Sequence, residues 1–264
     1  MVPYSAACGA RPGRPKSSAL GSWRCSARIL GVNASRTARE RVREEITREI
    51  TEIARSQLAT EGAAGLSLRA IAREMGMVSS AIYRYFPSRD DLLTALIIDG
   101  YDAIGVAAEK ADAACPPDDH AGRWLAVCRA VRDWALAHPH EYALVYGSPV
   151  PGYQAPQQTI APAARSATVY GKIISDAYRA GALDLPGMCP LPPGSFAPDA
   201  ARLRDSVMAD VPDAVAAGAV ASWASLFGMV SFELFGQFEN VITDRSAFFE
   251  HSMRRLGRLT GLTG

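Results

Sequence analysis

Four polar side chains share one face of a short predicted helix near residue 80. Ser79, Ser80, Tyr83 and Arg84 are spaced i, i+1, i+4 and i+5, which groups them on a helix. Small hydroxyls permit close approach to base edges, arginine can pair with guanine or phosphate, and tyrosine can donate to a phosphate oxygen. The combination predicts a surface that contacts double-stranded DNA.

Two short helices are expected to position this surface. Ser67 can cap the first helix, and Gly76 can supply the left-handed residue that ends it. The second helix is predicted over 78–86, where Pro87 stops it, and its Ile82 can face the first helix. The inward side of the first helix is apolar and consists of Leu68, Ile71, Ala72 and Met75. This arrangement is typical of a helix-turn-helix.

Longer helices are predicted on both sides of the pair. A capping box at Thr37 to Glu40 opens a helix that ends near Gly62, and its apolar positions are Val42, Ile46, Ile50 and Ile53. Ser88 and Asp91 form a second capping box, which begins a helix over 88–114. The DNA-binding domain is therefore expected at residues 36–89.

The run SLRAIAREMGMVSSAIYRYFPSR at residues 67–89 resembles the signature of the TetR family of transcriptional regulators. The family pattern is Thr-Val-x-x-Ile-Ala-x-x-Ala-Gly-Val-Ser-x-x-x-Leu-Tyr-x-Tyr-Phe, and agreement is dense over residues 40–100. Position by position, the resemblance implies operator contacts by Arg69, Ser79, Ser80, Ala81, Tyr83 and Arg84. It also implies phosphate contacts by Ser67, Tyr85 and Arg89.

Two positions depart from the family pattern. Val78 stands where a serine usually caps the recognition helix, and Ser79 stands where a lysine is common. Both departures weaken the usual grip on phosphate. One hypothesis is that the amino-terminal arm supplies the missing contacts with the DNA backbone, because the segment 11–16 resembles an AT-hook. An AT-hook places arginine in a narrow minor groove. The alternatives are a low-complexity basic tail or residues that precede the true start codon.

Charge is distributed unevenly along the chain. The net charge of +1 combines +8 over residues 1–89 with −7 over residues 90–264. A basic segment joined to an acidic body indicates a polyanion-binding module beside a second domain. Residues 1–35 have no sustained hydrophobic period and are expected to form a disordered basic arm.

Only helices are predicted beyond the DNA-binding segment. No strand pattern or repeat occurs, and prolines and glycines mark loops at 147–156 and 181–198. Hydrophobic periodicity predicts helices over 118–138, 157–181, 199–210, 213–239 and 245–259. The expected fold is all-α, with an N-terminal three-helix helix-turn-helix domain joined to a C-terminal helical bundle at 90–264.

The resemblance implies that this bundle binds a small-molecule effector and forms a homodimer. Residues 134–149 resemble a TetR subgroup with a WHG-type ligand domain. Seven aromatic residues could line an apolar pocket, although core packing is the alternative role for each: Trp124, Tyr142, Tyr146, Tyr153, Tyr170, Trp223 and Phe227. The helices at 213–239 and 245–259 are apolar on more than one side, which favours a twofold dimer.

Metal and cofactor chemistry are not expected. His138, His140 and Glu141 could hold a metal ion, but Pro139 lies between the histidines and no further ligand is near, which favours a helix-end role. The five cysteines are scattered without a Cys-x-x-Cys pair. No Gly-x-Ser-x-Gly elbow, P-loop, dinucleotide fingerprint or His-Glu-x-x-His motif is present.

These observations predict a cytoplasmic, ligand-responsive regulator that is not an enzyme and does not use a membrane. A repressor that binds a palindromic operator and is released by a small molecule is the leading function. The alternative is a sequence-indifferent DNA-coating protein that uses the basic arm. No window reaches the about 20 uninterrupted apolar residues of a membrane span, because serines, glycines and Glu233 interrupt the segment 220–238.

Overall fold

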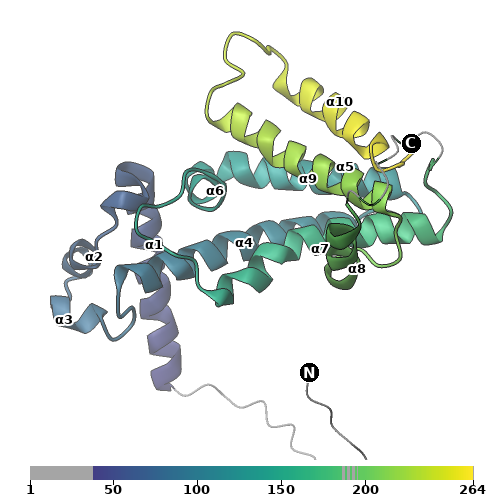
Figure 1. The fold of residues 1–264 in the computed structure, drawn as a ribbon. Helices are drawn as coiled ribbons and strands as arrows, with labels where there is room; N and C mark the ends of the chain where they lie inside the picture. The colour runs from purple at the N-terminus through teal and green to yellow at the C-terminus, as the bar shows by residue number, and fades with distance from the viewer. Residues whose placement is uncertain (1–37, 186–187, 189–190, 192–193, 195, 264) are drawn as a thin grey trace, which may run out of the picture. The chain divides into compact units, whose positions relative to one another are not determined.

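The computed structural model describes residues 38–185, 188, 191, 194 and 196–263. These residues form ten α-helices and one short 3-10 helix, and their only β-type pairing is an isolated bridge between Leu183 and Leu262 (Figure 1). The all-α prediction is confirmed. The chain divides into two compact units, residues 1–41 and 42–264. Within the first unit, residues 38–41 are described and begin α1; the expected arm at 1–35 lies outside the described residues.

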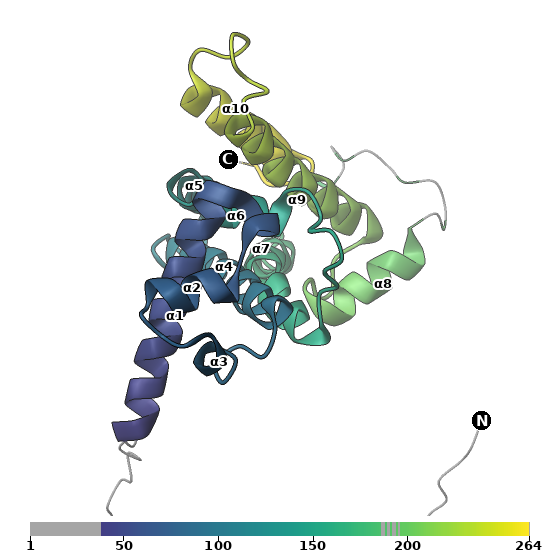
Figure 2. The same ribbon diagram turned by 90° about the vertical axis from the view of Figure 1, so that its left-hand side faces the viewer.

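Four helices make up the amino-terminal part of the described chain. They are α1 (Ala38–Gly65), α2 (Leu68–Glu74), α3 (Ser79–Ile82) and α4 (Arg89–Ala113). Figure 2 looks onto the first three. Helix α1 contains a kink at Gly62, whose φ of 68° is outside the helical range, so the predicted end near Gly62 marks this kink.

One apolar core joins these helices. Side chains from α1, α2 and α3 meet the first turns of α4, and the buried residues are Ile50, Ala54, Leu58, Leu66, Leu68, Ile71, Ala72, Ile82, Phe86, Leu92, Leu93 and Leu96. Val42 was expected on the inward face of α1, but it is 54% exposed because the core begins only at Ile46 and Ile50. A hydrogen bond also links α1 to the start of α2: Gln57 Oε1 accepts from the backbone N–H of Ser67 at 3.1 Å.

Helix α3 is shorter than the predicted span 78–86. It covers Ser79–Ile82, and residues 83–85 form turns. The N–H groups of Arg84 and Tyr85 bond to carbonyls three residues back, at 3.2 and 2.9 Å. Bonds of this type tighten the last turn of a helix, so the coil continues after α3 without regular α geometry.

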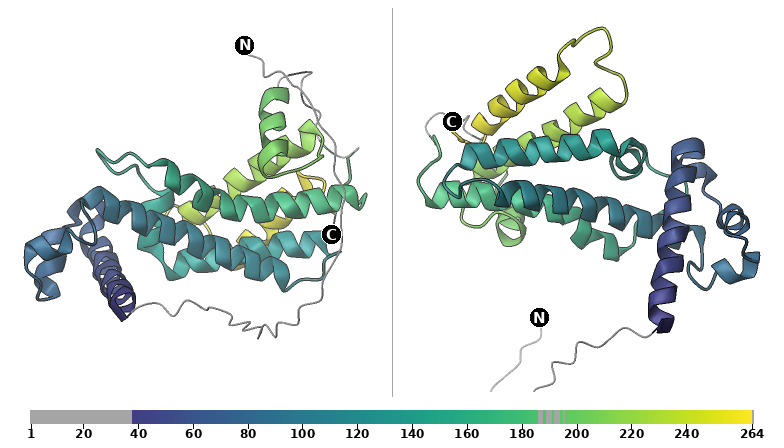
Figure 3. Two further views of the ribbon diagram at one scale, coloured as in Figure 1. Left: turned by 90° about the horizontal axis from the view of Figure 1, so that it is seen from below. Right: turned by 180° about the vertical axis from the view of Figure 1, so that it is seen from behind.

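The remaining helices build the body together with α4. They are α5 (His120–Ala137), α6 (Pro139–Tyr146), α7 (Ile160–Arg179), α8 (Ala197–Ser206), α9 (Asp213–Leu234) and α10 (Arg245–Arg258), with the 3-10 helix η1 (Gln157–Thr159) before α7. Helices α4 and α7 run alongside each other (Figure 3). Helix α5 also packs against α4, α7, α9 and α10.

Two body segments differ from expectation. Residues 139–146 form α6, because Pro139 at its first turn has a fixed φ and lacks only an N–H that needs no partner there. Helix α9 ends at Leu234 rather than near 239. Gly236 adopts φ 79° there, and the N–H of Gln237 bonds to the carbonyl of Phe232 at 2.8 Å, which closes the helix as a Schellman motif does.

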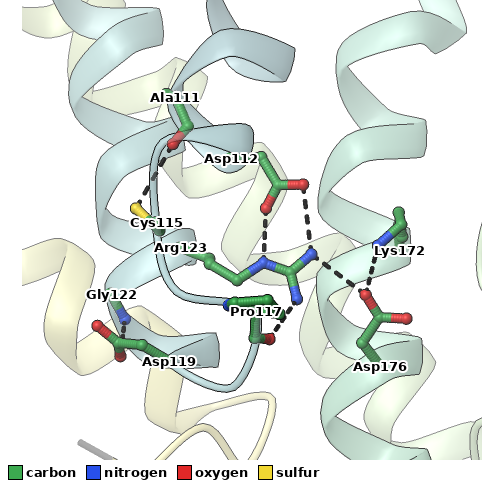
Figure 4. Close-up of polar contacts among 9 residues, drawn as sticks. All are labelled: Ala111, Asp112, Cys115, Pro117, Asp119, Gly122, Arg123, Lys172 and Asp176. Carbon is green, nitrogen blue, oxygen red and sulfur yellow. Dashed lines mark hydrogen bonds and ion pairs between the residues drawn. The ribbon is translucent and has the colours of Figure 1, made fainter.

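A buried arginine fastens three body helices together. Arg123 of α5 is 3% exposed, and its guanidinium donates from Nε to Asp112 of α4 at 2.7 Å (Figure 4). It also reaches Asp176 of α7 at 3.1 Å and the carbonyl of Pro117 at 3.0 Å. Lys172 donates to the same Asp176 carboxylate at 2.6 Å. The buried charge is therefore both paired and hydrogen-bonded, as burial requires.

Helix α9 is the one helix among the described residues that is long and apolar enough to cross a membrane by length and composition alone. The core helix of a globular protein meets the same criterion. Val215, Leu226 and Val230 of α9 are fully buried in the body.

Candidate nucleic-acid interface

The turn between α2 and α3 depends on the backbone of one glycine. Gly76 has φ 65°, and a Cβ added there would meet no heavy atom within 4 Å, so conformation rather than space requires glycine. The N–H of Met77 bonds to the carbonyl of Ala72 at 2.8 Å and closes α2. At the other end of α2, Ser67 is the N-cap, and its hydroxyl accepts from the N–H of Ala70 at 3.3 Å.

The predicted contact residues of α3 and the following turn lie on the surface. Ser79, Ser80 and Arg84 are exposed, and Tyr83 is 41% exposed, whereas Ile82 is fully buried on the opposite side. Ala81 is half-buried, and Arg69 of α2 is exposed. The predicted face thus presents hydroxyl and guanidinium groups to solvent, while its apolar side holds it to the core. We call the set of Ser79, Ser80, Tyr83 and Arg84 the reading face.

Three other predicted contact residues also have roles within the fold. Ser67 caps α2, as described above. The Nη2 of Arg89 donates to the carbonyl of Ala63 at 2.6 Å, which ties the start of α4 to the end of α1. Tyr85 is half-buried, and the guanidinium of Arg43 lies over its ring, with 5.3 Å from Cζ to the centroid. Phosphate contacts by Ser67, Tyr85 and Arg89 remain predictions.

Helix α3 begins directly after Val78, one of the two residues that depart from the family pattern. This residue occupies the N-cap position in an extended conformation, and it supplies no side-chain hydrogen bond. Its side chain is 70% exposed. Helix α3 therefore begins without a side-chain cap, and the weaker contact with phosphate remains a prediction.

The structure brings six of the seven predicted effector residues into one continuous cluster. Successive ring centroids lie 4.4 Å apart for Trp124 and Tyr170, 5.7 Å for Tyr170 and Trp223, and 4.8 Å for Trp223 and Phe227. Tyr146 lies 4.1 Å from Phe227 and 5.2 Å from Tyr142. We call these six residues the aromatic cluster. Their rings pack together between α5, α6, α7 and α9: Tyr146 stacks on Phe227 and Tyr170 on Trp223, and the other pairs are tilted or edge-on.

Two hydroxyls in the aromatic cluster differ in their partners. The hydroxyl of Tyr142 donates to the carbonyl of Phe227 at 2.9 Å and lies 3.0 Å from Ser231 Oγ. The buried hydroxyl of Tyr170 has no hydrogen-bond partner among the described residues. Its neighbours Ser222 and Thr260 donate instead to the carbonyls of Leu256 and Gly257, each at 2.7 Å.

Burial shifts the pKa of both hydroxyls upward. It raises the pKa of Tyr142 to about 12 and raises the pKa of Tyr170 further. A buried hydroxyl without a partner is costly to the folded state.

Two further tyrosines make contacts between α4 and the rest of the body: Tyr153 lies against α4, and Tyr101 lies on it. The hydroxyl of Tyr153, the seventh predicted residue, lies 2.9 Å from Thr94 Oγ1 of α4 and not in the aromatic cluster. Tyr101 of α4 was not predicted as an effector residue, yet its ring meets that of Tyr146 edge-on at 5.9 Å. Its sequence signal was only that of an apolar helix position, and no local pattern could have paired it with a residue 45 positions away.

His138 lies at the junction of α5 and α6, in keeping with the helix-end role. It is the C-cap of α5, its ring stacks on Trp134 at 5.1 Å, and its Nδ1 lies 2.9 Å from the Trp134 carbonyl. Within the described part of the chain, no three His, Cys, Asp or Glu side chains are grouped so that they could hold a metal ion. Burial raises the pKa of the Cys128 thiol well above its ordinary value, which disfavours its thiolate form.

Comparisons with known proteins identify the fold and its class of function. Residues 50–96 match the family described as bacterial regulatory proteins, tetR family, and residues 124–256 match the tetracyclin repressor-like C-terminal domain. The chain is 39% identical over 224 residues to the HTH-type transcriptional regulator Rv1816 of Mycobacterium tuberculosis, covering 83% of this chain and 93% of that protein.

Solved structures agree with these sequence matches. The putative regulatory protein SCO4313 is 36% identical with a TM-score of 0.67, covering 83% of this chain and 98% of that one. A protein of unknown function from Rhodococcus sp. RHA1 is 26% identical with a TM-score of 0.59, covering 80% and 94%. The matched families and named relatives are transcriptional regulators rather than enzymes. The chain belongs to the TetR family of helix-turn-helix, DNA-binding transcriptional regulators.

Proposed function

We propose that this protein is a cytoplasmic transcriptional repressor that binds a palindromic operator as a homodimer and is released by a small molecule. The observation that carries the proposal is the reading face. It exposes hydroxyl and guanidinium groups on a coil that Ile82 and Phe86 hold against an apolar core. A helix of this size, supported on one side only, fits the major groove of B-DNA.

Dimerisation is supported by the outer sides of α9 and α10. Phe232 is 53% exposed and Phe248 is 37% exposed, and a Cβ on Gly228 would meet no atom of its own chain within 4 Å. The exposed positions of α9 are spaced along one side and include Val220, Ala221, Ala224, Gly228 and Phe232. An exposed apolar side with small residues fits the close approach of a second copy.

The dimer can be tested with a charge on this side. Phe232→Glu should shift the protein from dimer to monomer in sedimentation at micromolar concentration, because the carboxylate would be buried against the partner. Ile160→Glu is the matched control, since Ile160 is 63% exposed on α7 and belongs to neither helix. A monomeric parent protein, or an unchanged Phe232→Glu dimer, would contradict this arrangement.

The effector is expected to enter the aromatic cluster. A flat, largely apolar molecule could separate the stacked rings, and one polar group could pair with the unpartnered Tyr170 hydroxyl. Such a movement would reach α4 through the contact between Tyr146 and Tyr101. Effector binding would then favour a conformation whose recognition helices no longer match the operator.

Helix α4 links this movement to the DNA-binding core. Asp99 of α4 accepts from Arg55 of α1 at 2.9 Å. Burial raises the pKa of the Asp99 carboxyl, and Arg55 opposes this rise. Thr94, five residues earlier, meets Tyr153. A shift of α4 would therefore change the contacts that hold α1 in place.

Competition binding tests the function. A palindromic fragment recovered from random DNA should stay bound in excess random competitor, and compounds that quench tryptophan fluorescence should release it. Retention without any releasing compound would support a regulator that does not sense a small molecule. Loss of the fragment to random DNA would instead favour the sequence-indifferent coating protein.

A further inference from the structure

Helix α1 extends beyond the core that it helps to form. Its buried residues begin at Ile50, whereas residues 42–45 are exposed and still helical. About one turn of helix therefore projects past the apolar contacts with α2 and α4. Packing within the core does not explain this extension.

Arg43 of the extension touches the carboxyl end of the reading face. Its Nη2 donates to the backbone carbonyl of Arg84 at 3.0 Å, across 41 residues of sequence. Its Cζ lies 5.3 Å from the centroid of the Tyr85 ring, within the about 6 Å of a cation–π contact. The guanidinium of Arg43 thus contacts both the backbone of Arg84 and the ring of Tyr85, which are two predicted DNA contacts.

The coil that carries the reading face has few bonds of its own. Helix α3 has four residues, and Val78 gives it no side-chain cap. The following turn has two bonds between residues three apart and one between residues four apart, from the N–H of Phe86 to the carbonyl of Ile82. Short helices of this kind depend on tertiary support. A carbonyl at a helix end without an intrahelical partner is stabilised by a cationic donor, which is what Arg43 provides at Arg84.

We propose that Arg43 is a positioning residue for DNA recognition, which holds Arg84 and Tyr85 in the orientation that reads the operator. The inference rests on the proposed reading face. It makes the extension of α1 part of the DNA-reading apparatus, although the guanidinium of Arg43 acts through Arg84 and Tyr85 rather than on a base.

A direct phosphate contact by Arg43 would have a different signature. Loss of a phosphate contact weakens binding to all sequences and lowers the slope of log K against log salt by about 0.9. Loss of a positioning contact lowers the affinity for the operator more than that for random DNA. The ratio of the two affinities therefore separates the roles.

The test measures that ratio by fluorescence anisotropy at several salt concentrations for Arg43→Gln, with Arg48→Gln as a matched loss of charge on the same helix. Arg43→Gln should lower the ratio by about 5- to 30-fold, the range expected for one hydrogen bond and one cation–π contact. Arg48→Gln should leave the ratio within about twofold of the parent. Arg43→Lys should recover only part of the loss, because an ammonium lacks the planar fork.

Two further variants separate the ring from its hydroxyl. Tyr85→Phe keeps the ring under Arg43 and removes only the predicted phosphate contact, so it should weaken binding to operator and random DNA alike and preserve the ratio. Tyr85→Leu removes the ring and should lower the ratio. Equal loss of operator and random binding in Arg43→Gln, or an unchanged ratio, would overturn the inference. Arg84→Ala in the same assay tests the reading face itself: if it lowers the ratio while Arg43→Gln does not, only the positioning role fails.

Discussion

In the reading face, the polar groups of Ser79, Ser80 and Arg84 point to solvent, whereas in the aromatic cluster the hydroxyls of Tyr142 and Tyr170 are buried among rings. The polar groups of the reading face lie outside a small core, where a large charged partner can contact them. The hydroxyls of the aromatic cluster are enclosed, so that only a molecule that displaces the rings could contact them. Changes in one region should therefore alter DNA recognition, and changes in the other should alter stability and effector response.

The largest expected effect belongs to the body. Arg123→Met removes the buried guanidinium and leaves Asp112 and Asp176 facing each other, so the free energy of unfolding should fall by about 3 to 5 kcal/mol in chemical denaturation. Arg179→Met is the control, because Arg179 also pairs with Asp176 but its side chain is 52% exposed, and it should cost less than about 1 kcal/mol. Operator affinity of the folded protein should not change in either variant.

This network also predicts a dependence on pH. Burial acts to raise the pKa of Asp176, but the hydrogen bonds from Lys172 and Arg123 outweigh it and hold the pKa below its ordinary value of 3.8. The stabilisation is therefore complete above that value and is lost as the pH falls below it. The difference in stability between the parent and Arg123→Met should shrink in acid, and a constant difference would contradict the assignment.

Glycines with the same backbone conformation offer a comparison between the regions. Gly76 and Gly236 have φ 65° and 79°, so alanine at either position should cost about 1 to 2 kcal/mol of stability. Gly76→Ala should also weaken operator binding, because it distorts the turn before the reading face. Gly236→Ala should leave the DNA affinity of the folded protein unchanged. Equal effects on DNA binding would show that the two regions are not separable in this way.

Removal of single hydroxyls gives a smaller effect within the aromatic cluster. Tyr142→Phe loses two hydrogen-bond contacts and leaves the Phe227 carbonyl with one partner fewer, which should cost about 1 to 2 kcal/mol in thermal or chemical unfolding. Tyr170→Phe removes an unpartnered hydroxyl and should be neutral or stabilising, yet it should weaken effector binding. A destabilised Tyr170→Phe variant would mean that this hydroxyl is paired in solution.

The smallest effect is expected at the edge of the reading face. Tyr83→Phe removes one hydroxyl from an exposed ring, and operator and random DNA should both bind more weakly by about 0.5 to 1.5 kcal/mol. Filter binding on both DNAs checks this. An effect confined to the operator would assign Tyr83 to base recognition instead.

The amino-terminal elements could be predicted because their signals are local. Ser67, Gly76 and Ser88 each act on backbone groups within about one turn of helix, and the structure confirms a cap or turn at all three. The exposed side of α3 also follows from spacing alone. The length of α3 did not follow, because the coil changes after Ile82 to bonds between residues three apart, a change that hydrophobic periodicity does not show.

The other contacts depend on residues far apart in sequence. The aromatic residues of the body could be named from composition, but their order in one cluster and the separate place of Tyr153 follow from how five helices meet. Arg123 and Arg43 carried no motif, since their partners lie up to 53 residues away. Pairings of this kind appear only when the fold is known.

Selection of bound fragments from random DNA, with the parent and with Arg84→Ala in parallel, tests the central claim most directly. The parent should enrich a palindrome whose half-sites lie about 34 to 36 Å apart or a multiple of that distance. Arg84→Ala should lose the preference at one position, repeated symmetrically in both half-sites, because the guanidinium pairs with a base edge there. Failure of the parent to enrich any recurrent sequence, or an identical preference in both proteins, would contradict the account.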